Sequence, residues 1–197
     1  MKKLLITSIL SVTAAVAFGQ GTVFFANDSA TLSSPPDRLI RFAATGQAAT
    51  GTNIQVQLYY GAVGANSASL TAVTSAPARL RGSTTSIPGV WASPSGDRTL
   101  GNLPFGAAAV LQVRAWDIAD GSTYENAVAN PNHSGLIGVS TTFAYQIPAT
   151  SGAPPDQFFM VNFTGFNIAP SGVIIPEPAT FALVGVGAVL LALRRRK

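Results

Sequence analysis

The sequence predicts an all-β protein: an antiparallel β-sandwich, immunoglobulin-like or jelly-roll-like, flanked by an N-terminal signal helix and a C-terminal transmembrane helix. Three observations carry this prediction. Short runs in the central region alternate apolar and polar residues. Many of the chain's 19 glycines and 13 prolines separate these runs, and each end of the sequence carries a continuous apolar segment. Long helical patterns do not separate the strands, which argues against a doubly wound α/β fold.

The first residues have the three parts of a secretory signal peptide. Two lysines come directly after the first residue, and an apolar h-region runs over residues 4–17. Small residues then favour cleavage between Gly19 and Gln20, with a cut after Ala17 as the alternative. The h-region is shorter than the ~20 apolar residues of a spanning helix, which argues against an uncleaved anchor. We therefore predict a signal peptide at residues 1–19, removed by signal peptidase.

Residues 20–170 are predicted to form one extracytoplasmic β domain with about eight or nine short strands. The clearest run is "NIQVQLYYGA", whose two faces are Ile54, Val56, Leu58 and Tyr60, and Gln55, Gln57 and Tyr59. In "AAVLQVRAWDI" the two faces are Val110, Gln112, Arg114 and Trp116, and Leu111, Val113 and Ala115. The other strands are expected in the ranges 21–27, 38–43, 70–80, 97–103, 135–147 and 156–168. Pro77 interrupts the run 70–80 and suits an edge position.

One short helix is predicted in "DGSTYENAVAN". Ser122 or Thr123 can serve as the N-cap, and Glu125 or Asn126 follows closely. The sequence "NPN" ends the helix, because a proline cannot continue it.

The last residues, "PEPATFALVGVGAVLLALRRRK", combine a proline-bracketed acid, an apolar run and four cations. Residues 179–193 are apolar on all sides, which a buried amphipathic core helix is not. Fifteen helical residues span only about 22 Å, which makes a short transmembrane helix. Residues 194–197 (Arg194, Arg195, Arg196 and Lys197) would stop transfer and stay on the cytoplasmic side. Residues 171–178 are then a linker that contains the Pro-Glu-Pro tripeptide.

Pro176, Glu177 and Pro178, the hydrophobic run and the terminal "RRRK" together resemble a PEP-CTERM sorting domain, a C-terminal signal of exported bacterial proteins. The resemblance covers about residues 174–197. It implies recognition by an exosortase, a membrane-embedded cysteine protease or transpeptidase, with the tripeptide as the processing-recognition element of a substrate. The exosortase would remove the tail at or near the tripeptide. The body would reach the cell surface or an exopolysaccharide matrix, and the helix would be a transient anchor.

Charge and cysteine content exclude several classes of function. Six of the twelve cations stand in the two terminal segments, and the region between holds six basic and seven acidic residues, a net charge of −1. The chain's net charge of +4 therefore does not indicate a surface that binds nucleic acid. Without cysteine, the chain has neither disulfides nor thiolate metal sites.

Few residues suggest catalysis or metal binding, and we predict no catalytic residues, cofactor or metal site. The single histidine, His133, lies in a predicted loop and has no G-x-S-x-G elbow as a partner motif. Asp117, Asp120 and Glu125 lie close together in "WDIADGSTYEN" and could bind Ca²⁺ as an alternative, although their spacing is not that of an EF-hand. The plainer interpretation of these acids is an Asx-turn and a helix cap.

Three functions are compatible with these features. The leading hypothesis is a non-enzymatic, exported bacterial surface or extracellular-matrix protein with a structural or adhesive role. The alternative is a carbohydrate-binding module of the cell envelope, with or without calcium, in which aromatic side chains stack on sugars. The candidates for such a platform are Trp91, Trp116, Tyr59, Tyr60, Tyr124 and Tyr145. The third is a hydrolase with a carboxylate pair. The expected partners are exosortase, signal peptidase, the membrane and exopolysaccharide.

Overall fold

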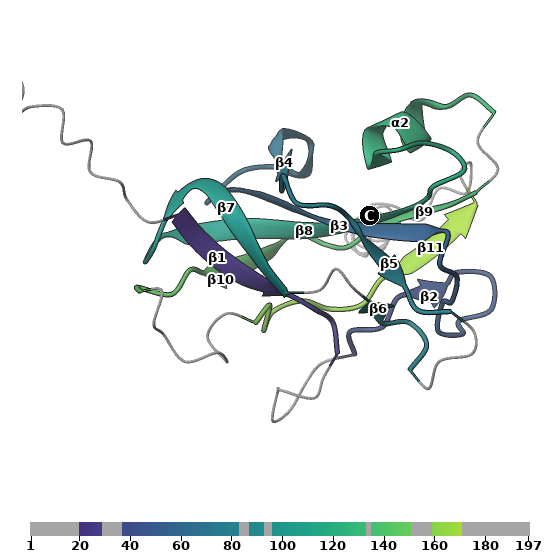
Figure 1. Ribbon diagram of the computed structural model, residues 1–197, viewed down its shortest axis with the longest axis horizontal. Coiled ribbons are helices and arrows are strands. Elements are labelled where there is room, and N and C mark those ends of the chain that lie inside the picture. The colour runs from purple at the N-terminus through teal and green to yellow at the C-terminus, as the bar shows by residue number, and fades with distance from the viewer. Residues whose placement is uncertain are drawn as a thin grey trace, which may run out of the picture.

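The computed structural model describes residues 20–28, 37–82, 87–92, 96–132, 135–150 and 159–170. These residues form mostly β-strands and contain a single α-helix, which confirms the all-β prediction (Figure 1). Within these ranges no helix has the length and apolar character to cross a membrane. The predicted signal peptide at 1–19 and transmembrane helix at 179–193 lie outside the described residues.

The described residues contain eleven strands, one 3-10 helix and one α-helix. The strands are β1 (Gln20–Phe25), β2 (Arg41–Phe42), β3 (Ile54–Ala62), β4 (Thr71–Ala72), β5 (Ala78–Leu80), β6 (Trp91–Ala92), β7 (Gly96–Pro104), β8 (Ala108–Asp117), β9 (Leu136–Val139), β10 (Phe143–Gln146) and β11 (Asn167–Pro170). The helices are η1 (Ser67–Ser69) and α2 (Tyr124–Ala129).

These strands form two sheets. β1 and β7 make a two-stranded sheet, and the other nine strands make one sheet in the order β2-β11-β9-β8-β3-β5-β6. Two further strands join this path, because β10 also pairs with β8 and β4 with β3. Pairing is antiparallel except between β11 and β2, which run parallel.

The β3–β8 ladder is the centre of the larger sheet, with nine residue pairs from Ile54 opposite Asp117 to Ala62 opposite Ala109. The predicted alternation in both strands is confirmed. Leu58 lies opposite Val113, and both side chains are fully buried in the hydrophobic core. A period of two places every second residue on the same face, so the apolar set of each strand meets that of its neighbour.

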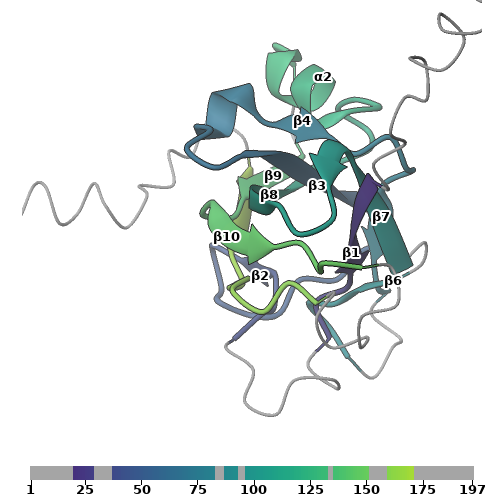
Figure 2. The ribbon, with the colours of Figure 1, turned by 90° about the vertical axis from the view of Figure 1, so that its left-hand side faces the viewer.

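The two sheets enclose one core. Val23 and Phe25 of β1 and Leu100 of β7 belong to the same buried cluster as Leu58 of β3. Gly101 of β7 shows how closely the sheets approach, since a Cβ there would clash with the Tyr60 hydroxyl. Seen along the long axis, α2 and β4 lie above β3 and β8, on the opposite side from β2 and β6 (Figure 2).

The structure refines three of the predicted strands. The run 70–80 becomes β4 and β5, because Pro77 has no N–H to continue the pairing with β3. The edge position predicted for this run is wrong for β5, which lies between β3 and β6. The run 135–147 becomes β9 and β10, and the described part of the run 156–168, residues 159–168, contributes the start of β11.

The predicted helix is present as α2. Its N-cap is Thr123, whose hydroxyl oxygen accepts a hydrogen bond of 3.2 Å from the backbone N–H of Asn126. Ala127 turns inward and is fully buried, while its neighbours along the helix face solvent. The helix therefore packs on the sheet through Ala127 and through the half-buried Tyr124, whose ring lies edge-on to the rings of Tyr59 and Trp116.

Candidate functional site

Most of the predicted processing residues lie outside the described part of the chain. This holds for Gly19, for the Pro176–Pro178 tripeptide and for the cations Arg194, Arg195, Arg196 and Lys197. Gln20 is described and begins β1, where it lies opposite Pro104 of β7. The predicted signal cleavage therefore falls directly before the first strand.

The acids proposed as calcium ligands are each held by a different set of partners. The Asp117 carboxylate accepts hydrogen bonds from the Asn53 amide at 2.6 Å and from the Ala119 N–H at 2.9 Å. The Asp120 carboxylate accepts one from the Gly135 N–H at 2.8 Å. Among the described residues, no group of three or more acidic or imidazole side chains is placed to hold a metal ion. The hydrogen bond from the Ala119 N–H to the Asp117 carboxylate forms the expected Asx-turn.

The aromatic side chains do not form a sugar-stacking platform. Four of the six candidates are buried (Tyr59, Trp91, Trp116 and Tyr145), and Tyr60 and Tyr124 are half-buried. Trp91 stacks on Phe25 with ring centroids 4.7 Å apart, and its indole N–H donates to the Phe25 carbonyl. Both tryptophans are thus packing residues, as alternation in the strands favours for Trp116.

The residues that the fold brings together most closely lie on the second face of the β3–β8 ladder. Arg114 is their centre, and its side chain is only 10% exposed. Its guanidinium donates to Gln112 Oε1 at 3.0 Å, to Glu125 Oε1 at 3.1 Å and to the Ser67 carbonyl at 2.6 Å. It also stacks over the Tyr59 ring, 3.9 Å from the centroid, which is a cation–π contact.

Further hydrogen bonds connect the partners of Arg114 to one another. The Tyr59 hydroxyl donates to Glu125 Oε2 at 3.1 Å, and the Ser67 hydroxyl donates to Gln112 Oε1 at 2.9 Å. Gln112 Nε2 donates to the Ser140 carbonyl at 3.0 Å. We call Tyr59, Ser67, Gln112, Arg114 and Glu125 the outer-face network. It joins α2 and η1 to the sheet.

The pKa shifts of the tyrosines in and beside this network favour a structural role over a catalytic one. Burial raises the pKa of Tyr59, and the Glu125 carboxylate that accepts its hydrogen bond raises it further. The pKa of Tyr124 is also raised, chiefly by burial. Both phenols therefore stay protonated at neutral pH, and the Tyr59 hydroxyl acts as a hydrogen-bond donor, not as a base or nucleophile.

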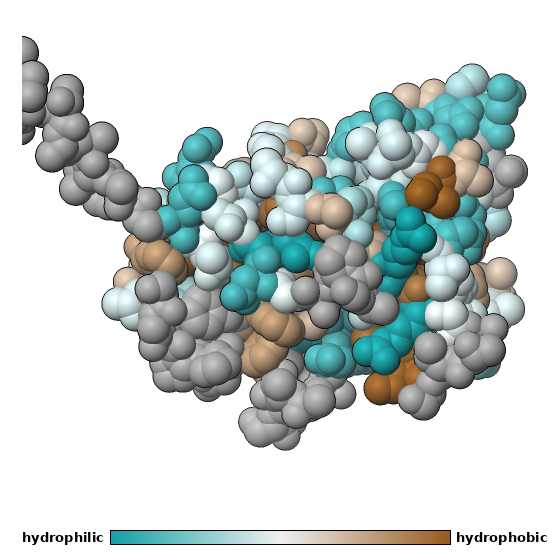
Figure 3. Space-filling model, viewed as in Figure 1, coloured by the Kyte–Doolittle hydropathy of each residue, from teal (hydrophilic) through white to brown (hydrophobic). Residues whose placement is uncertain are grey.

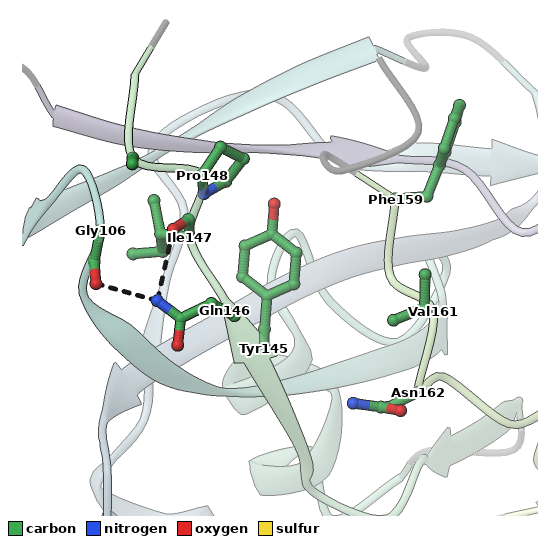
Figure 4. A pocket seen from close by; sticks show the side chains of 9 residues that line it. Gly106, Tyr145, Gln146, Ile147, Pro148, Phe159, Val161 and Asn162 are labelled. Carbon is green, nitrogen blue, oxygen red and sulfur yellow. Dashed lines mark hydrogen bonds between the residues drawn. The ribbon is translucent and has the colours of Figure 1, made fainter. Parts of the chain in front are cut away.

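Two of the surface hollows have linings made entirely of described residues. The first, of about 450 Å³, lies between the end of β10 and the segment 159–162 (Figure 4). Phe159 and Val161 give it an apolar wall, and the Gln146 amide at its rim donates to the Gly106 carbonyl at 2.8 Å. The Tyr145 hydroxyl that lines it donates to the Thr22 carbonyl. Its polar groups thus already make internal hydrogen bonds.

The second hollow, of about 320 Å³, lies where β2 and β11 run side by side. Asp37 and Arg41 line it as an ion pair of 2.8 Å, together with Phe166 and Asn167. The Leu39 N–H and the Arg41 side chain, in that order, lower the pKa of Asp37, so its carboxylate is ionised at neutral pH. A charged pair, an amide and an aromatic ring are the groups that bind sugar hydroxyls and ring faces.

Among the described residues, the exposed large hydrophobic side chains are few and come from separate parts of the chain. On the face shown in Figure 3, brown residues occur in small separate groups among hydrophilic ones. The exposed large hydrophobic residues are Val63, Ile87, Ile118, Val128 and Val161. Scattered apolar residues of this kind are normal on a soluble surface.

Sequence reasoning missed both the outer-face network and the second hollow. The alternation in β3 and β8 had already placed Tyr59, Gln112 and Arg114 on one side of each strand. The missing information was the register, which sets Gln57 opposite Arg114 and Tyr59 opposite Gln112. Arg41 and Asn167 carry no periodic signal, because β2 and β11 are only two and four residues long.

Comparison with known proteins identifies the C-terminal segment. The PEP-CTERM protein-sorting motif matches residues 175–197 and confirms the resemblance. The chain is therefore an exported protein that carries a C-terminal exosortase sorting signal, with a membrane-anchored or surface location. No curated protein and no solved structure is significantly similar to the chain.

Proposed function

We propose that this exported protein with a PEP-CTERM sorting motif is a non-enzymatic building or adhesive component of the bacterial cell surface or extracellular matrix. In this proposal signal peptidase removes residues 1–19, and an exosortase removes the tail at or near Pro176–Pro178. The body, residues 20–170, is a two-layer β-sandwich of immunoglobulin-like or jelly-roll-like type. The exopolysaccharide matrix is its destination.

One observation supports the non-enzymatic role above the others. The most closely connected polar groups, those around Arg114, bind one another and so attach α2 and η1 to the sheet. A catalytic site would instead direct a nucleophile and a base at a cavity. In the two hollows described above, the one lining carboxylate, Asp37, is paired with Arg41.

The first experiment measures the intact mass of the mature protein from cells that express the full chain and its exosortase. We expect a chain that begins at Gln20 and ends near Pro176. Glu177→Gln should retain the tail, while Asp97→Asn, a matched substitution on an exposed acid of β7, should be processed normally. A wild-type mass that still includes Lys197 would contradict exosortase processing.

The role of the mature body needs a separate measurement. We expect the processed protein to co-purify with the exopolysaccharide fraction and to leave the polysaccharide chain length unchanged. Shortening of the polysaccharide, abolished by an acid-to-amide change, would instead establish a hydrolase.

The second hollow favours carbohydrate binding as the alternative function. Arg41 and Asp37 remain 36% and 59% exposed there, so sugar hydroxyls can reach both charged groups. Phe166 is half-buried beside them, and Asn167 is exposed. Ionised groups in a fixed pair make strong, directional hydrogen bonds to hydroxyls.

Titration with the purified exopolysaccharide tests this alternative. Asn167→Ala and Arg41→Met should weaken binding, and Asn162→Ala, an equivalent change in the first hollow, should not. Repeating the titration with calcium and with a chelator tests the calcium-assisted form. Equal binding by all three variants would exclude the second hollow as the sugar site.

A further inference from the structure

The two ends of the body lie at opposite ends of the molecule. Gln20 lies opposite Pro104, and the turn from Pro104 to Ala107 leads directly into the first residue of β8. Pro170 lies opposite Leu136, beside the last residues of β8. β8 has ten residues and is about 30 Å long, and the start of β1 and the end of β11 lie toward its opposite ends (Figure 1).

The last strand is also fixed within the sheet. β11 lies between β2 and β9, and is therefore not a free edge. Beyond β2 the Ala43 N–H donates to the Ile168 carbonyl at 2.9 Å, and the chain then turns back. We call the turn 43–47 together with Leu136 and Pro170 the exit end, since the chain leaves the body there. Because Pro170 ends a strand that is paired on both sides, the exit end stays next to the point where the tail begins.

Only five residues, 171–175, separate Pro170 from the tripeptide. The six steps from Pro170 to Pro176 reach at most about 20 Å, whatever conformation they take. A body of this size has a radius of gyration of about 15 Å, and its far end lies beyond that reach. Only one end of the body can therefore come close to a membrane-embedded enzyme that holds the tripeptide.

We propose that the exit end is the surface that faces the exosortase and the membrane during processing, and that residues 171–175 set the distance between them. This inference rests on the proposed exosortase processing. It assigns to the body a fixed orientation, with the start of β1 pointing away from the membrane.

The chemistry of the exit end suits close approach. Residues Ala43, Ala44, Thr45 and Gly46 are exposed, small and uncharged. Two acids beside Leu136, Asp117 and Asp120, are held by Asn53 and Gly135. Asp37 and Arg41 form an ion pair, and Arg41 also donates to the Gly46 carbonyl at 3.1 Å. The charged groups at this end are therefore already paired within the body, which lowers the cost of bringing it against a membrane protein.

Linker length provides the first test, with the full chain expressed beside its exosortase. Deleting residues 172–174 leaves a reach of about 10 Å. We expect the processing rate to fall by more than about tenfold, because the scissile segment can no longer enter the enzyme without a clash. Replacing the same three residues by Gly-Ser-Gly keeps the length and should keep the rate within about twofold.

Each outcome of this test is informative. Equal processing of the deletion and the wild type would overturn the proposal. Loss of processing in the Gly-Ser-Gly variant would also overturn it, because the chemistry of the segment and not its length would matter. Absence of processing in the wild type would instead refute the proposed function. The unfolding midpoint of each purified variant shows whether the body stays folded.

Single cysteines provide the second test, since the natural chain has none. Ala44→Cys lies at the exit end, and Ala108→Cys is a matched exposed alanine at the other end of β8. In cells with an inactive exosortase, a large membrane-impermeant maleimide should label position 44 more slowly than position 108. After processing by the active enzyme, the two rates should become equal. Equal rates before processing would contradict the proposed orientation.

Discussion

The two faces of the β3–β8 ladder are both buried, but different interactions hold them. On the inner face, Leu58 and Val113 pack in the hydrophobic core without polar partners. On the outer face, Gln112 and Arg114 are 2% and 8% exposed, and each is hydrogen-bonded to several groups. Apolar burial needs only close packing, whereas polar burial needs a partner for nearly every donor.

This difference shows that the polar groups of the outer face are occupied by partners within the body. Its sequence pattern of glutamine, tyrosine and arginine resembles a solvated face. η1 and α2 cover it, and its polar groups bond to them and to one another. The following changes test how the two faces differ, from the largest expected effect to the smallest.

Leu58→Ala removes packing from the inner face. Leu58 is fully buried in the core, so we expect a loss of about 3 kcal/mol in the free energy of unfolding. Denaturant titration of the purified protein measures this loss. Val63→Ala, at an exposed valine after the same strand, should cost less than about 0.5 kcal/mol. A similar cost for both changes would contradict the assignment of the inner face as the core.

Arg114→Met removes the centre of the outer-face network and keeps an apolar side chain. Gln112, Glu125 and the Ser67 carbonyl lose donors, and we expect a loss of about 2 kcal/mol. Glu125 is 56% exposed and can be rehydrated, which limits the loss. Arg41→Met, which breaks the exposed pair with Asp37, should cost less than about 1 kcal/mol. The two unfolding curves decide whether burial of the network matters.

Alkaline pH acts on both faces through buried phenols. Burial raises the pKa of Tyr59 on the outer face and of Tyr145 in the core. Unfolded tyrosine loses its proton near pH 10, whereas these folded phenols keep theirs at that pH. Above pH 10 the unfolded state therefore binds fewer protons, and stability falls by at most about 1.4 kcal/mol per pH unit for each tyrosine.

Tyrosine-to-phenylalanine changes separate the two contributions. Tyr59→Phe and Tyr145→Phe should each reduce the slope of stability between pH 10 and 11. At pH 7 each should cost only the hydrogen bond to Glu125 or Thr22, about 1 kcal/mol. A slope that neither change reduces would show that other groups cause the alkaline loss.

Thr123→Ala removes the N-cap of α2 and thus loosens the cover of the outer face. We expect a loss of about 1 kcal/mol, because the Asn126 N–H loses its acceptor. Hydrogen exchange should become faster in α2 and remain unchanged in β3 and β8. Ser122→Ala, the other predicted cap position, should have a smaller effect, since Ser122 is not the cap. Equal effects of both changes would contradict the observed cap.

Local patterns identified the strands that carry long alternating runs. β3 and β8 each have nine or ten residues, so their period of two is visible in the sequence and fixes which residues share a face. The sequence also predicted a hydroxyl N-cap at Ser122 or Thr123, and the structure shows that Thr123 is the cap. The tripeptide, apolar run and basic end form a contiguous signal, and the family comparison confirms it.

Trp91 and the β2–β11 pair show why other features could not be predicted. β6 and β2 have two residues each, which is too short for any period to appear. Trp91 is buried because Phe25 and Phe163, which are distant in sequence, pack on its ring. The parallel contact of β11 with β2 likewise joins residues more than one hundred positions apart.

The sequence by itself determined the periodic strands, the capped helix and the sorting tail, since each depends on residues close together along the chain. Only the tertiary structure decided that the polar face of β3 and β8 is buried. It also decided that the two ends of the body point in opposite directions. Both depend on strand register and order, which are set when distant strands compete to bury their apolar faces in one core.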